Sequence, residues 1–229
     1  NILTLLRTIL TYGVDLGWLD RCPPFRKPRV QILDQEYRYL RTHQEIVRFL
    51  AAAKAIDPSL HALYATAIYT GMRAGELAGL LWRRVDLERR LITVACSYAG
   101  PTKGGYVRHV PILDALLPIL TAWRVQFPVA SDYVFPSATG TMLQPSARVF
   151  QERLHRVLDG AGFERVWVGG RHVRYLVFHS LRHTFASHWV MNGGDLFKLQ
   201  QIGGWKSHAM VQRYAHLAPH AFEGDWSLL

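Results

Sequence analysis

Two arginines, Arg73 and Arg182, lie in short motifs whose residue types suit the chemistry of a phosphodiester. Arg73 belongs to residues 70–76 (TGMRAGE), and Arg182 belongs to residues 179–184 (HSLRHT). A phosphoryl-transfer transition state spreads negative charge over the non-bridging oxygens, and a planar guanidinium can donate two parallel hydrogen bonds to them. We therefore expect Arg73 and Arg182 to clamp one phosphate between them.

Three further side chains could complete the cleavage of a phosphodiester without a metal ion. The hydroxyl of Tyr214 could attack the phosphorus and form a covalent intermediate that stores the bond energy. Lys103, in a glycine-rich segment, could protonate the leaving 5′ oxygen. His179 precedes Arg182 by three residues, so on a helix the two share a face. Histidine can also move a proton near neutral pH.

Each of these residues has an ordinary structural role when it is considered alone. A single tyrosine or tryptophan, such as Tyr214 or Trp205, more often belongs to a core than to an active site. His183 is expected to be buried and hydrogen-bonded in a structural role. Arg108 is expected either to contact DNA or to keep a hairpin solvated, and both alternatives stay open. Glu76 is expected to pair with a basic residue and orient it.

Taken together and in order, the motifs resemble those of the tyrosine recombinase (phage integrase) family. The resemblance covers roughly residues 42–216 and rests on four motifs: TGMRAGE, TKGGYVRHVP, HSLRHT, and GGW followed by QRYAHL. It implies a DNA strand-cleaving enzyme in which Arg73 and Arg182 bind the scissile phosphate. Tyr214 would form a 3′-phosphotyrosyl bond and release a free 5′ hydroxyl.

The same resemblance implies the supporting roles. Lys103 would be the general acid, His179 would assist proton transfer, and Glu76 would fill the acidic supporting position. The chain departs from the family at Trp205, where most members carry a histidine. An indole offers one N–H donor and a large packing surface but cannot shuttle a proton. Trp205 is therefore expected to donate a hydrogen bond and to support its neighbours by packing. Acid–base catalysis is then left to Lys103 and His179.

Hydrophobic periodicity predicts mainly helices with one small antiparallel β-sheet, an α+β class. A capping box at Thr42-His-Gln-Glu45 marks the start of one of the helices. Two short β runs flank the glycine-rich segment, as a hairpin or as part of a small sheet, and residues 173–178 are expected to be a strand or an extended loop. The predicted helices cover residues 1–20, 42–55, 59–70, 73–81, 112–127, 144–160, 180–192, 195–202 and 207–215, and the predicted strands cover 91–94 and 107–110.

Two domains are expected. Residues 1–41 would be the remnant helix and linker of an N-terminal core-binding domain, because the resemblance places a separate helical domain before the catalytic one. Residues 42–229 would be the catalytic domain with its C-terminal tail. In the family this tail packs onto a neighbouring protomer, and here Phe222 and Trp226 could be its apolar anchors.

The composition agrees with a polyanionic partner. The chain carries 27 Lys and Arg against 17 Asp and Glu, a formal charge of +10, and such a field attracts nucleic acid. Double-stranded DNA is the expected partner and the cytoplasm the expected location, with the two cysteines reduced. No membrane span is expected. No cofactor or metal is expected either, because P-loop, GxGxxG and HExxH motifs are missing from the sequence.

Two other functions remain as alternatives. A type IB topoisomerase would use the same chemistry as a monomer to relax supercoils. A non-catalytic DNA-binding regulator would keep the charge and lose the reaction. A recombinase would act as a homotetramer on two DNA sites, although an isolated domain could be a monomer. A metal shared by His179 and His183, four residues apart, is the least favoured alternative.

Overall fold

The chain divides into two units, Asn1–Glu36 and Tyr37–Leu229. The computed structural model describes residues 2–24, 38–98, 100–101, 107–126, 131–145, 148–168, 170–174 and 176–219. The helices are α1 (Ile2–Asp15), α2 (His43–Ile56), α3 (Pro58–Thr70), α4 (Ala74–Ala78), α5 (Leu117–Gln126), α6 (Arg148–Gly160), α7 (Phe178–Met191), α8 (Leu196–Gly203), α9 (Ala209–Gln212) and two 3₁₀ turns, η1 (Trp82–Arg84) and η2 (Ala215–Leu217). The strands are β1 (Val85–Asp86), β2 (Leu91–Val94), β3 (Cys96–Ser97), β4 (Gly100–Pro101), β5 (Arg108–Pro111), β6 (Arg165–Val168) and β7 (Arg171–Arg174).

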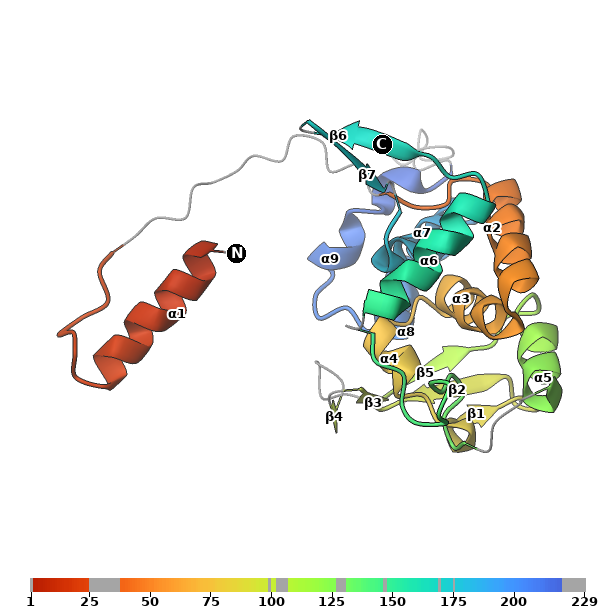
Figure 1. Cartoon of the computed structure of the whole chain (residues 1–229), viewed down its shortest axis with the longest axis horizontal. Coiled ribbons are helices and arrows are strands. Elements are labelled where there is room, and N and C mark those ends of the chain that lie inside the picture. The colour runs from red at the N-terminus through yellow and green to blue at the C-terminus, as the bar shows by residue number, and fades with distance from the viewer. Residues whose placement is uncertain are drawn as a thin grey trace, which may run out of the picture. The chain divides into compact units, whose positions relative to one another are not determined.

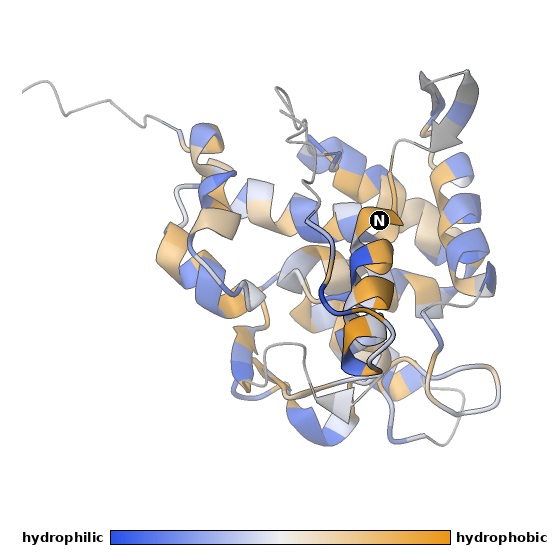
Figure 2. Ribbon diagram, turned by 90° about the vertical axis from the view of Figure 1, so that its left-hand side faces the viewer, coloured by the Kyte–Doolittle hydropathy of each residue, from blue (hydrophilic) through white to orange (hydrophobic). Residues whose placement is uncertain are grey.

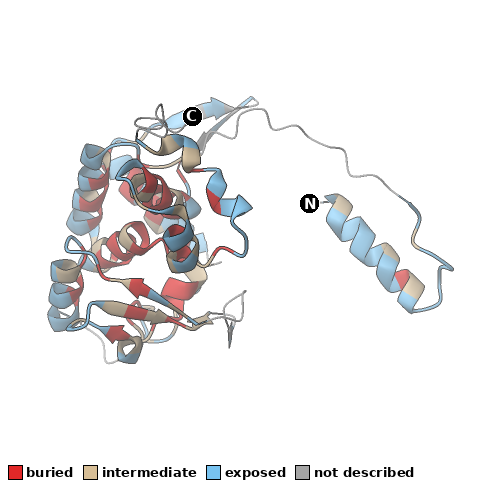
Figure 3. Ribbon diagram, turned by 180° about the vertical axis from the view of Figure 1, so that it is seen from behind, coloured by how far each residue is buried: buried red, intermediate tan, exposed pale blue. Residues whose placement is uncertain are grey.

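The described residues of the first unit contain one amphipathic helix, α1, which ends earlier than the predicted helix over residues 1–20. The chain turns at Gly17, whose φ of 72° is the left-handed conformation that favours glycine. Apolar side chains along α1 are exposed, including Ile2 at 85% and Ile9 at 57% (Figures 2 and 3). The assignment of this unit to the end of a separate DNA-binding domain stays a prediction.

The second unit begins with well-defined helix starts. The predicted capping box is confirmed, because Thr42 accepts from the Glu45 backbone and the Glu45 side chain accepts from the Thr42 backbone. Asp57 caps α3 in turn, and Pro58 occupies the first turn, where its missing N–H costs nothing. Helix α3 ends at Gly71, which has a left-handed φ of 63°.

The core forms around α3 and α7. Both helices are buried over most of their surface (Figure 3), as expected for helices that are apolar nearly all round. Helix α3 packs against α2, α5 and α7. Because α7 carries both His179 and Arg182, the core fixes the position of one half of the candidate site.

The small sheet has three antiparallel strands in the order β1-β2-β5, and in Figure 1 it lies below α3 and α6 and beside α5. The two predicted β runs are therefore part of a sheet rather than an isolated hairpin. Strand β5 pairs with β2, with Arg108 opposite Val94 and Val110 opposite Ile92. Ile92 and Val110 are fully buried, and this face of the sheet joins the core.

A second hairpin, β6–β7, replaces the strand or extended loop expected over residues 173–178. Its antiparallel register places Trp167 opposite His172. These two rings contact edge to face with centroids 4.8 Å apart, and Trp167 is 64% exposed. The prediction missed β6 entirely.

Other predicted helix boundaries were also wrong. Helix α5 begins at Leu117 rather than at residue 112, because Pro118 belongs in a first helical turn. Helix α4 ends at Ala78 instead of residue 81. The predicted helix over residues 207–215 is a short α9 followed by a 3₁₀ turn, and Tyr214 lies between them. Among the described residues, no helix has the length and apolarity needed to cross a bilayer.

Candidate active site

Glu76 joins two arginines in a buried cluster of charges. Arg108 donates to both of its carboxylate oxygens, at 3.0 and 2.7 Å, and Arg73 Nη1 donates to Oε1 at 2.8 Å. The Glu76 side chain is only 3% exposed. Burial alone would raise the pKa of this carboxyl, but hydrogen bonds and charge from Arg108, and then from Arg73, outweigh burial and leave the pKa lowered. The expected pairing of Glu76 with a basic residue is therefore present.

The end of α8 gathers three arginines. Its last carbonyls lack partners within the helix and carry the negative end of the helix dipole. Arg108 Nε donates to Ile202 O at 2.8 Å, Arg182 Nη1 to Gly203 O at 2.8 Å, and Arg73 Nη2 to Gly204 O at 2.9 Å. Three consecutive carbonyls thus bring both candidate phosphate-binding arginines, Arg73 and Arg182, to one place.

Glycine is required at this helix end. Gly204 has a left-handed φ of 65°, and a Cβ there would lie 3.0 Å from the Arg108 side chain. A Cβ on Gly203 would lie 1.8 Å from the ring of Trp205. The two glycines therefore allow the arginines and the indole to approach the backbone.

Arg182 is buried and incompletely bonded. Its side chain is 2% exposed, and Nη1 donates to Gly71 O at 2.6 Å as well as to Gly203 O. Its Nη2 is buried and has no hydrogen-bond partner among the described residues. The guanidinium stacks on the Trp205 ring, 3.8 Å from its centroid. Burial, and then the charge of Arg73, lower the pKa of Arg182 to about 9, so the group stays charged at neutral pH.

Helix α7 presents two histidines on the face that carries Arg182. The rings of His179 and His183 meet edge to face with centroids 4.9 Å apart. His179 is exposed as a residue, yet partial burial of its imidazole and the charges of Arg182 and Arg73 lower its pKa. His183 is half-buried. Burial, followed by the charges of His179, Arg182 and Arg213, lowers the pKa of His183 to about 4.

Tyr214 reaches the same place from the other end of the sequence. It is 1% exposed, its hydroxyl lies 2.6 Å from His183 Nδ1, and its ring centroid is 6.1 Å from that of Trp205. Trp205 in turn covers Arg182. The Tyr214 phenol is therefore held beside the Arg182 guanidinium, whose Nη2 has no described hydrogen-bond partner.

Six of the seven site residues predicted from the sequence lie together. They come from the start of α4, from α7, from the connection between α8 and α9, and from the residues just after α9. They are Arg73, Glu76, His179, Arg182, Trp205 and Tyr214. Lys103, the predicted general acid, lies outside the described residues. Trp205 packs against Arg182 and Tyr214, as expected of a supporting side chain. No described residue accepts a hydrogen bond from its indole N–H.

Two neighbouring residues differ from what the sequence suggested. The solvated-hairpin alternative for Arg108 was wrong, because its side chain is 10% exposed and is paired with Glu76. Contact of Arg108 with DNA stays a prediction. His183 has the hydrogen bond expected of it, but its partner is Tyr214, which the sequence reading missed. The spacing of four residues from His179 places both rings on one helical face, but it does not indicate Tyr214 as the partner.

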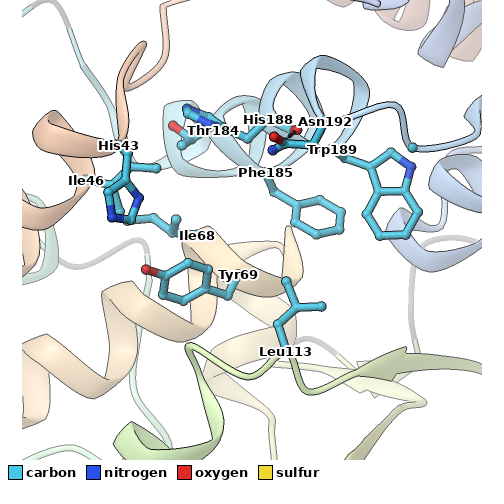
Figure 4. Close-up of a pocket in the computed structure, with 11 residues that line it drawn as sticks. His43, Ile46, Ile68, Tyr69, Leu113, Thr184, Phe185, His188, Trp189 and Asn192 are labelled. Atoms are coloured by element: carbon cyan, nitrogen blue, oxygen red, sulfur yellow. Dashed lines mark hydrogen bonds between the residues drawn. The ribbon is translucent and has the colours of Figure 1, made fainter.

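A pocket beside α7 is a different feature. It has a volume of about 460 Å³, and its lining is mostly apolar (Figure 4). Thr184 and His188 of α7 line it, and they point largely to the opposite side of the helix from His179 and His183. Tyr69 and Leu113 face them across the pocket (Figure 4). The pocket therefore lies outside the charged cluster.

Comparison with known proteins identifies relatives of the second unit. Residues 40–220 match the phage integrase family. Tyrosine recombinase XerC of Xanthomonas campestris pv. campestris (strain B100) is 35% identical over 149 residues, covering 65% of this chain and 41% of the relative. The integrase of Salmonella phage P22 is 28% identical over 214 residues, covering 88% of this chain and 49% of the relative. The chain thus spans less than half the length of these curated relatives.

Solved structures share the fold. The crystal structure of XerA recombinase superposes with a TM-score of 0.63 at 29% identity, covering 87% of this chain and 64% of that one. The catalytic domain of bacteriophage HP1 integrase has a TM-score of 0.59 at 28% identity, covering 83% and 94% of the two chains. The Tn1549 transposon integrase has a TM-score of 0.71 at 18% identity, covering 94% and 72% of the two chains, and supports the fold alone.

Proposed function

The chain belongs to the phage integrase family, and from that premise we propose that it is the catalytic part of a site-specific DNA recombinase that uses Tyr214 as its nucleophile. The observation that carries the proposal is the buried, unpartnered Nη2 of Arg182 beside the Tyr214 phenol. A buried N–H without an acceptor costs free energy. The unpartnered Nη2 therefore favours a ligand that supplies the missing acceptor. A phosphate oxygen is the acceptor that fits a guanidinium best.

The proposed reaction is a transesterification. The Tyr214 oxygen attacks the phosphorus and loses its proton, the bond from phosphorus to the 5′ oxygen breaks, and that oxygen takes up a proton. The 3′ end stays joined to the tyrosine. A 5′ hydroxyl from a partner strand then reverses these steps and rejoins the DNA. No metal ion enters this scheme, because the arginines supply the charge that stabilises the transition state.

The remaining roles follow from position and chemistry. Arg73 and Arg182 hold the non-bridging oxygens, and Glu76 orients Arg73 through the 2.8 Å ion pair. Lys103 protonates the leaving oxygen. His179, exposed and beside Arg182, assists proton transfer at the same phosphate. Trp205 covers the Arg182 guanidinium and keeps water from it.

Double-stranded DNA is the proposed substrate, encountered in the cytoplasm. The formal charge of +10 favours a polyanion. Two structures that share the fold were determined with DNA, the Tn1549 integrase with a circular intermediate DNA and XerH with its difH substrate. A topoisomerase or a non-catalytic regulator is less well supported, because the family members that match are named recombinases and integrases.

The active form is proposed to be a tetramer on two DNA sites. Two rounds of cleavage and rejoining would exchange the strands through a four-way junction. The tail beyond Ala218 would bind a neighbouring copy through Phe222 and Trp226. The apolar pocket between α2, α3 and α7 could receive an aromatic side chain of that size.

A covalent-adduct assay tests the proposal. Nicked duplexes from the DNA that flanks the gene are incubated with the protein, with and without a chelator, and the products are denatured. We expect an adduct that survives chelation and disappears in Tyr214→Phe. Tyr133→Phe is the matched control, because Tyr133 lies in a β-bridge with Leu81 and lines neither the site nor the pocket described above, and it should form the adduct normally. Adduct formation by Tyr214→Phe would exclude Tyr214 as the nucleophile.

A further inference from the structure

The Tyr214 hydroxyl has a partner that the proposed mechanism does not use. His183 Nδ1 lies 2.6 Å from the phenol oxygen, and the two rings are tilted by 47° with centroids 6.0 Å apart. Tyr214 is 1% exposed, so this hydrogen bond is shielded from water. A shielded bond of this length fixes the orientation of the phenol more firmly than a bond at the surface would.

The charges around His183 decide which group donates. His179 and Arg182 face it from its own helix, and Arg213 faces it from the segment after α9. Together with burial, these groups lower the pKa of His183 to about 4. The imidazole is therefore neutral at physiological pH and carries one hydrogen. With that hydrogen on Nε2, Nδ1 accepts the hydrogen bond that the Tyr214 hydroxyl donates.

The same surroundings make His183 a poor base. An ordinary phenol has a pKa near 10, and an imidazole whose pKa is lowered to about 4 takes up a proton only weakly. The hydrogen bond can hold the phenol, but the imidazole cannot carry away its proton efficiently. The role that remains for His183 is to orient the Tyr214 phenol.

We propose that His183 is a positioning residue for the nucleophile: its Nδ1 holds the Tyr214 hydroxyl so that the phenol stays beside Trp205 and Arg182. The inference rests on the proposed function of Tyr214. Trp205 bounds the phenol on another side, with its ring 6.1 Å away, and itself stacks on Arg182. The two histidines of α7 therefore have different roles. His179 assists proton transfer at the phosphate, and His183 orients the nucleophile.

Two amide substitutions of similar polarity separate this role from general packing. His183→Asn places an amide oxygen where Nδ1 stood and retains an acceptor for the phenol. His183→Gln places its amide near the position of Nε2 and removes that acceptor. We expect the Gln variant to form the covalent adduct about 10–100 times more slowly, since small misplacements of a reacting group cost about that much. The Asn variant should stay within a few-fold of wild type.

Non-covalent DNA affinity provides the first control. His183 is half-buried and is not assigned to the phosphate, so both variants should bind nicked duplex as tightly as wild type when Tyr214→Phe prevents cleavage. A Gln variant that cleaves as fast as wild type, or faster, would overturn the proposal. Equal slowing of the Asn and Gln variants would also overturn it, because the acceptor would then not matter.

A modified substrate distinguishes positioning from proton donation. When sulfur replaces the bridging 5′ oxygen, the leaving group departs as a thiolate and needs no proton from the enzyme. The defect of His183→Gln should persist on this substrate, because the nucleophile is still misplaced. Recovery to the wild-type rate would instead assign His183 to protonation of the leaving oxygen and would contradict the inference.

A DNA-free measurement keeps the inference separate from the proposed function. Thermal unfolding is compared for His183→Gln, Tyr214→Phe and the double variant. If the hydrogen bond exists, either single change removes it, and the double variant should melt close to the less stable single variant. Additive losses would reject the contact even if wild type forms the adduct. If the losses of thermal stability are coupled but wild type forms no adduct, the proposed function is rejected, whereas the hydrogen bond between His183 and Tyr214 is retained.

Discussion

Glu76 shows how one buried carboxylate organises the charged site. It receives hydrogen bonds from Arg73 and Arg108, and it is nearly inaccessible to solvent. A buried ion pair is weak proof of added stability, but loss of one partner leaves uncompensated charge behind. Removal of Glu76 would leave two guanidinium groups near Arg182 with no opposing carboxylate in contact.

We therefore predict that Glu76→Gln lowers both stability and the rate of DNA cleavage. The loss of unfolding free energy should be about 3 kcal/mol, the low end for breaking a buried pair, because the amide still accepts hydrogen bonds. For a domain of this size, that loss corresponds to about 6–12 °C in melting temperature. Thermal unfolding at neutral pH measures it directly.

The pH dependence supplies the control. The folded pKa of Glu76 lies below the ordinary value of 4.5, so its contribution is complete above that value and is lost as the pH falls through the folded pKa. The difference in melting temperature between wild type and Glu76→Gln should be largest at neutral pH and shrink below about pH 4. A difference that stays constant to pH 2 would show that the charge of Glu76 is not responsible.

Sequence reasoning found most of the site residues because their types and order are local information. It did not find the pairing of Arg108 with Glu76, which lie 32 residues apart, because no short pattern encodes which strand residue meets which helix. The link between His183 and Tyr214 was missed for the same reason. Both contacts depend on how α4, α7 and β5 pack around the end of α8.

At the scale of elements, the junction of α3 and α7 depends on Gly71. Its carbonyl accepts from Arg182, and its φ of 63° suits glycine. A Cβ there would lie 2.4 Å from Phe185 Cδ1. This position therefore combines backbone strain with a steric conflict in the core.

We predict that Gly71→Ala destabilises the protein more than Gly162→Ala does. Gly162 has a similar φ of 69° but open space around it, so its substitution should cost only the left-handed strain of about 1–2 kcal/mol. Gly71→Ala should cost a further 1–3 kcal/mol, roughly, for overpacking against Phe185. Denaturant unfolding of both variants makes the comparison, and equal losses would show that Phe185 moves aside freely.

The elements with clear local signals were predicted well. The capping box and the left-handed glycine after α3 mark their helix ends chemically, and both are present. The β6–β7 hairpin was missed because its strand sequences, RVWV and RHVR, do not alternate strictly between apolar and polar residues. Helix α9 was predicted too long, since apolar spacing continues through Tyr214 while the backbone changes to a 3₁₀ turn.

At the scale of the whole molecule, assembly should depend on the tail. We predict that Trp226→Ser reduces the tetramer formed on DNA, because an apolar anchor would be lost from the contact between copies. The matched control is Trp167→Ser, since Trp167 is exposed on a hairpin outside the tail. Light scattering of the protein on a duplex with two sites measures the mass. An unchanged mass for Trp226→Ser would show that the tail does not join the copies.

The identity of the residue joined to DNA tests the central claim most directly. After adduct formation and nuclease digestion, trypsin should release the peptide that begins at Tyr214, because Arg213 immediately precedes it. Fragmentation by mass spectrometry then locates the remaining nucleotide. We predict that it is attached to Tyr214 through a 3′ phosphate. A nucleotide on any other residue, or attachment through a 5′ phosphate, would contradict the mechanism.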